Sequence, residues 1–186
     1  MLNAELKLRH SKGDDMKIRI AILILVAGLT VSAFAADASA PVTNATAAFE
    51  RLKGLVGTWQ ADTNMGKLQV TYELTSGSHV LLERETGDAQ QHNMVTAYYV
   101  DGDRLALTHY CELGNEPHMV AHKINLDSGE IVFDFAGAGN LASRNAKYMH
   151  NATIRLVDAD HFTGLWTLFE NNKPKLTVTA QYTRVK

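Results

Sequence analysis

The chain has 186 residues, and its 18 Lys and Arg against 20 Asp and Glu leave a formal net charge of only −2. That length suits one domain rather than two, and the absence of a basic cluster excludes nucleic-acid binding as a main function. The single cysteine, Cys111, excludes an internal disulfide and a Cys-based zinc site.

The N-terminal region has the three parts of an export signal. A short positive segment around Lys17 precedes the apolar run 20–29, and Ala-Phe-Ala at 33–35 fits the small-x-small cleavage pattern. Residues 1–35 are therefore predicted to be a signal peptide with an upstream extension, cleaved near Ala35-Ala36. The expected location is periplasmic or secreted, with no stable membrane anchor after cleavage.

Residues 36–48 are small and polar and are predicted to be a flexible leader, so the domain is expected to span 49–186. Apolar residues within 49–56 recur at helical spacing and predict one short helix. Beyond it the apolar residues recur at every second position, which is typical of strands. Strands are predicted at 58–63, 67–74, 79–86, 92–100, 104–111, 118–126, 130–135, 148–157, 161–170 and 174–185.

Polar turns separate these alternating runs. Turns rich in Asp, Asn and Gly between strands are typical of hairpins. Ten short strands joined by hairpins predict an all-β fold, an antiparallel up-and-down β-barrel with a short N-terminal helix, because closure removes the exposed edges of a long sheet. Residues 136–147 interrupt the alternation and are predicted to be a long loop or a short helix at one barrel end.

Several polar side chains fall on predicted inner faces, because side chains alternate between the two faces of a strand. A fully packed core rarely takes many polar groups, since each needs a partner. An enclosed, partly polar cavity accommodates them, and barrels of eight or more strands can hold a small ligand. The inward sets include Val95, Ala97 and Tyr99 in the fourth strand, and His118, Val120, His122, Ile124 and Leu126 in the sixth.

One segment resembles a known family. Residues 52–59 (Leu-Lys-Gly-Leu-Val-Gly-Thr-Trp) resemble the start of the calycin barrels, which are the lipocalin, fatty-acid-binding and nitrobindin-like proteins. Further pieces look like a family of bacterial exported proteins of calycin type, and they lie at 107–111, 114–117, 149–150 and 158–162. The resemblance covers most of 50–186 and implies the fold but no activity.

The main functional hypothesis is an exported binding protein that holds a partly hydrophobic small molecule inside the barrel. Small-molecule pockets are mostly apolar and contain a few polar groups that orient the ligand. The residues predicted to contact the ligand are Tyr99, His109, His118, His150, Trp166, Tyr182 and Arg184.

Two other functions stay open: an enzyme that uses an inner-face His as acid/base or metal ligand, and a structural envelope protein with a packed barrel. No catalytic residue is assigned. A haem or metal is not favoured, because His118 and His122 lie ~13 Å apart along a strand, too far to share one ion. Cys111 is interpreted as a small buried residue rather than a nucleophile. Nothing in the sequence indicates an oligomeric state.

Overall fold

The computed structural model describes residues 43–87 and 93–186. The predicted signal peptide, its cleavage position and most of the predicted leader lie outside the described residues. Within these two ranges, no helix is long and apolar enough to cross a membrane.

The described part of the chain is built mainly from strands. Helix α2 spans Asn44–Leu52 and continues into the 3-10 helix η1 (Lys53–Leu55), while a second 3-10 helix, η2 (Ser76–Ser78), joins two strands. The strands are β1 (Gly57–Thr63), β2 (Gly66–Thr75), β3 (Val80–Gly87), β4 (Val95–Asp101), β5 (Arg104–Tyr110), β6 (Glu116–Asn125), β7 (Glu130–Gly139), β8 (Tyr148–Leu156), β9 (His161–Glu170) and β10 (Lys173–Arg184).

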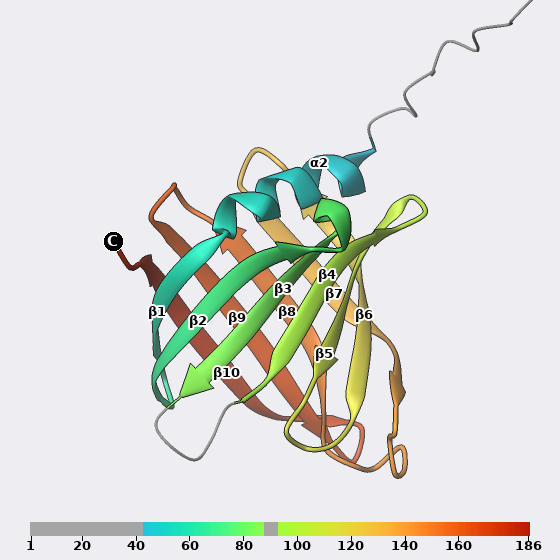
Figure 1. The fold of residues 1–186 in the computed structure, drawn as a ribbon. Coiled ribbons are helices and arrows are strands. Elements are labelled where there is room, and N and C mark those ends of the chain that lie inside the picture. The colour runs from blue at the N-terminus through green and yellow to red at the C-terminus, as the bar shows by residue number, and fades with distance from the viewer. Residues whose placement is uncertain (1–42, 88–92) are drawn as a thin grey trace, which may run out of the picture. The chain divides into compact units, whose positions relative to one another are not determined.

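The ten strands form one closed barrel. Each strand pairs antiparallel with its neighbours in the chain, and β1 pairs with β10 to close the sheet (Figure 1). The prediction of an all-β, antiparallel up-and-down barrel of ten strands with a short N-terminal helix is therefore confirmed.

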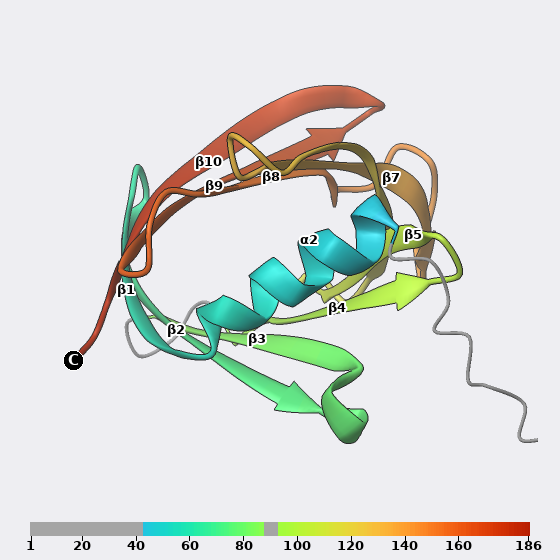
Figure 2. The same cartoon turned by 90° about the horizontal axis from the view of Figure 1, so that it is seen from above.

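Helix α2 begins at Asn44, five residues earlier than predicted. Thr43 has an extended backbone, and its Oγ1 accepts a hydrogen bond from the Thr46 amide at 3.1 Å, which satisfies a free N–H of the first turn. The helix lies across one end of the barrel, which we call the closed end (Figure 2). The buried side chains of α2 are Ala45, Ala48, Phe49 and Leu52.

The inward set predicted for β4 is wrong by one residue. Thr96 pairs with His109, and Tyr98 pairs with Leu107, so Thr96 and Tyr98 face the interior and are each only 1% exposed. The turn between β4 and β5 has two residues, 102–103, whereas three were expected. The pairing of the two strands therefore shifts by one residue, and such a shift exchanges the two faces of a strand. The residues that face outward instead are Val95, Ala97 and Tyr99.

A bulge changes the faces of β6. The register shifts between Ala121 and Lys123, and an extra residue in one strand interrupts the alternation. Ile124 and Leu126 pack against the core as predicted, but before the bulge the buried residues are Pro117 and Met119. The predicted inward placement of His118, Val120 and His122 is therefore wrong.

Part of the segment predicted as a loop or helix belongs to a strand. β7 continues through Gly139, and only residues 140–147 lie between β7 and β8. A Cβ atom at Gly139 would lie 2.5 Å from Glu116 Oε2 on β6, so glycine lets the Glu116 side chain cross this position. Residues 140–147 contain no helix.

Gly129 lies in the turn between β6 and β7, where it packs closely against Leu156 of β8 at the closed end. Its φ is +69°, and a Cβ there would overlap the Leu156 carbonyl oxygen. We expect Gly129→Ala to lower the free energy of unfolding by roughly 2–3 kcal/mol. Gly102→Ala is the control, because its φ is +64° but nothing lies within 4 Å; its cost should be about 1 kcal/mol. Equal losses in urea denaturation would contradict the role of the Leu156 contact.

Candidate functional site

A cavity of about 450 Å³ lies in the barrel at the end opposite α2, which we call the open end. Its rim includes residues of the β1–β2 turn and of the segment between β5 and β6. The apolar side chains that line it include Met94, Met149, Trp166, Leu168, Leu176, Val178 and Ala180, and the polar ones include Glu85, His109, Cys111 and Tyr182. The volume falls within the range of small-molecule pockets.

Strand β3 places two carboxyl groups inside the barrel. Glu83 is 1% exposed and Glu85 is 8% exposed, and both follow Leu81 on the inner face. Glu83 Oε2 accepts hydrogen bonds from Tyr98 Oη at 2.6 Å and from Tyr72 Oη at 2.9 Å. Glu85, the next inward residue of β3, forms a further side-chain hydrogen bond with Glu83.

The two carboxyl groups titrate as a pair. Burial, followed by the charge of Glu83 and a hydrogen bond to it, raises the pKa of Glu85 to about 8. Burial also raises the pKa of Glu83, against the lowering effect of its hydrogen bonds with Tyr98, Tyr72 and Glu85. At neutral pH, Glu85 therefore keeps its proton and donates it to Glu83, because two close carboxylates resist ionising together.

His109 adds an uncharged imidazole to the cavity wall. Its Nδ1 lies 2.9 Å from Thr96 Oγ1, and its ring centroid lies 5.2 Å from that of Trp166. Burial lowers the pKa of His109 to about 4, so the ring is neutral at pH 7. Nε2 is buried without a hydrogen-bond partner in the part of the chain that the structure describes. A buried polar atom without a partner is rare, and a bound molecule or a water would satisfy it.

Three of the seven predicted ligand contacts meet at the cavity. His109 on β5, Trp166 on β9 and Tyr182 on β10 all line it. Tyr182 is held in place by stacking on Phe162, with ring centroids 4.0 Å apart. Cys111 also lines the cavity, and burial raises the pKa of its thiol above the ordinary 9.0, so the thiol is protonated at neutral pH.

The structure places three other predicted contacts away from this cavity. Tyr99 and His118 contact each other on the outer face, with Tyr99 Oη 3.2 Å from His118 Nδ1. His150 stacks on Phe169 at a centroid distance of 3.9 Å and forms an aromatic cluster that does not line the cavity. The register of β8 shifts between Met149 and Asn151, so simple alternation fails at His150.

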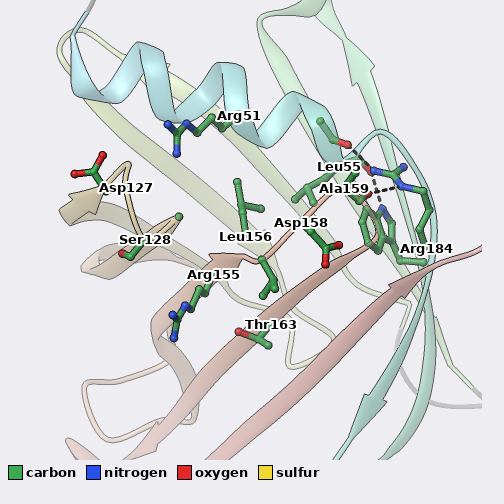
Figure 3. A pocket seen from close by; sticks show the side chains of 14 residues that line it. Arg51, Leu55, Asp127, Ser128, Arg155, Leu156, Asp158, Ala159, Thr163 and Arg184 are labelled. Atoms are coloured by element: carbon green, nitrogen blue, oxygen red, sulfur yellow. Dashed lines mark hydrogen bonds between the residues drawn. The ribbon is translucent and has the colours of Figure 1, made fainter.

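Arg184, the seventh predicted contact, lies at the closed end. It donates to the carbonyl oxygens of Gly54 (2.7 Å), Val56 (2.8 Å) and Ala159 (2.9 Å), and its Cζ lies 4.2 Å from the ring centroid of Trp59. A surface groove of about 890 Å³ adjoins it (Figure 3). Arg184 therefore joins η1 to the barrel and is not available to the internal cavity.

Sequence reasoning missed the acidic half of the site. Leu81, Glu83 and Glu85 alternate in β3, so the apolar Leu81 already indicated that both glutamates face inward. They were overlooked because carboxylates are almost never fully buried unless paired. Tyr98 was missed for a different reason, since the β4 register was wrong by one residue.

The fold and site define a closed β-barrel with an internal, partly polar cavity. No family model matches this chain, and no curated protein matches it. Among the described residues, no group of three His, Cys, Asp or Glu side chains could hold a metal ion.

Proposed function

We propose that this chain is an exported, calycin-like binding protein that holds a partly hydrophobic small molecule in the cavity at the open end of the barrel. The observation that carries the proposal is the cavity itself, with apolar walls around Glu85 and around a nitrogen of His109 that has no hydrogen-bond partner among the described residues. A few polar groups in an otherwise apolar pocket are typical of ligand sites.

Titration with N-phenyl-1-naphthylamine tests the proposal, because this uncharged fluorophore brightens in apolar surroundings. We expect one binding site per chain. Val178→Trp, on the cavity wall, should weaken binding by about tenfold or more, because the indole occupies the site. Thr177→Trp should leave binding unchanged, because Thr177 is exposed next to Val178 on β10.

Binding that is equal in Val178→Trp and Thr177→Trp would place the fluorophore elsewhere on the protein. An absence of binding to the unmodified chain would argue against an accessible cavity. Either result would contradict the proposal.

A second candidate function is acid–base catalysis, supported by one specific observation. The same cavity contains a protonated carboxyl group, Glu85, and a neutral imidazole, His109, which together form an acid and a base near pH 7. An enzyme would lose turnover in both Glu85→Gln and His109→Gln. A binding protein would show altered affinity and no turnover in any form.

A further inference from the structure

We propose that the ligand carries a protonated amine, and that Glu85, supported by Glu83, receives it beneath the apolar walls of the cavity. This inference rests on the proposed binding function and names the chemical class of the ligand. It predicts a preference for hydrophobic organic cations over alcohols and acids of the same size.

The first argument is the buried charge of the carboxyl pair. Glu83 and Glu85 lie within the barrel, and the groups that bond Glu83 are all uncharged: the hydroxyls of Tyr72 and Tyr98 and the protonated carboxyl group of Glu85. Burying a carboxylate without a cation is costly. A protein that needed only a filled barrel would be more stable with apolar residues here. The pair is therefore better explained by a partner that arrives with the ligand.

The second argument is the charge of the cavity wall. Among the described residues that line it, Lys67 is the only Lys or Arg, and its Nζ lies 3.1 Å from Asp62 Oδ1 at the surface. Glu112 lies at the rim, and its charge acts on Glu85. The described residues of the wall therefore offer no unpaired Lys or Arg to a carboxylate ligand.

The third argument is an unsatisfied polar atom in the cavity wall. His109 lines the cavity, and its Nε2 is buried without a hydrogen-bond partner among the described residues. An ammonium group has three donors and no acceptor, and a carboxylate pair offers several acceptor positions. Charge-assisted hydrogen bonds of this kind are roughly twice as strong as neutral ones.

Binding of an ammonium group would release one proton. Glu85 gives its proton to the solvent, and the carboxylate that forms pairs with the ammonium ion, so one positive charge leaves as another arrives and the net charge of the site does not change. The other titratable groups that face the pair are Tyr72 on β2, Tyr98 on β4, His109 on β5, Tyr182 on β10 and Glu112 at the rim. The tyrosines and His109 are neutral at pH 7, so the proton that is released comes from the pair of Glu83 and Glu85.

The test is displacement of N-phenyl-1-naphthylamine by three compounds with the same ring: 1-naphthylmethylamine, 1-naphthalenemethanol and 1-naphthylacetic acid. We expect the amine to bind roughly 10- to 100-fold more tightly than the alcohol, and the acid to bind most weakly. Glu85→Gln should bring the ratio of the amine's affinity to the alcohol's affinity close to one, whatever its effect on the affinity for the alcohol itself. A far-UV circular dichroism spectrum that matches that of the unmodified chain shows that the variant is folded.

Calorimetry tests the same proposal on the unmodified chain, through the protons released on binding. Titration at pH 7 in two buffers of different ionisation enthalpy should report about one proton released with the amine and none with the alcohol. Equal affinities for amine and alcohol, or an amine preference that survives Glu85→Gln, would overturn the amine assignment and leave the binding function intact. Failure of all three compounds and of the fluorophore to bind would instead overturn the binding function.

Discussion

Replacing Trp59 with alanine should lower the free energy of unfolding by about 3–5 kcal/mol, the usual cost of removing a large buried aromatic side chain. Trp59 is fully buried, its Nε1 donates to the Leu55 carbonyl at 2.7 Å, and its ring meets Phe162 edge-on at 4.8 Å. Arg184 packs on the ring and bonds the backbone of η1. Trp59 thus joins the barrel, η1 and the last strand, and urea denaturation measures the loss.

Trp59→Phe separates packing from hydrogen bonding at the same position. Phenylalanine keeps much of the contact with Phe162 but leaves the Leu55 carbonyl without the indole donor, so we expect a smaller cost of about 1–2 kcal/mol. Fluorophore affinity in this variant should match that of the unmodified chain, because the cavity lies at the other end of the barrel. A Trp59→Ala cost below that of Trp59→Phe would contradict the proposed role of the ring.

The free energy of unfolding should fall by about 2 kcal/mol between pH 6.5 and pH 8, through the titration of Glu85. In the unfolded chain Glu85 has its ordinary pKa of 4.5, whereas burial raises the pKa to about 8 in the folded state. Between these values the folded chain holds a proton that the unfolded chain has lost. Stability therefore decreases as pH rises, by about 1.4 kcal/mol per pH unit for one proton.

His109 has the opposite effect in a different pH range. Burial lowers its pKa from 6.5 to about 4, so its contribution is present above pH 6.5 and is lost as pH falls toward 4. Above pH 6.5 the ring is mainly neutral in both states, which leaves the coupled pair of Glu83 and Glu85 to set the slope. Urea denaturation at pH 6.5, 7.2 and 8 should show the decline, and Glu85→Gln should remove most of it. An unchanged slope in Glu85→Gln would show that another group titrates.

The fold was predictable because its main determinants are local. Alternation every second residue and polar turns are present in nearly every hairpin, and ten such strands have few arrangements other than a closed barrel. The faces were less predictable, because they depend on turn length and bulges. One residue fewer in the β4–β5 turn and one bulge in β6 moved Tyr99 and His118 to the outer face.

The site was predictable where a strand is regular. β5, β9 and β10 placed His109, Trp166 and Tyr182 inside as alternation requires. The placement of His150 could not be read from sequence, because it lies at a shift in register. Arg184 alternates inward, but it lies at the closed end, and its guanidinium bonds backbone carbonyls that no sequence pattern reveals. Glu83 and Glu85 were predictable in principle, since the same alternation applies to β3.

The two ends of this barrel have different tolerances to change. At the closed end, Trp59 and Arg184 make contacts that a substitution would break at once. At the open end, side chains such as Leu176 and Val178 border empty space and make fewer contacts on that side. The open end is therefore free to diversify, so that related chains could acquire new specificities without losing the scaffold that supports them.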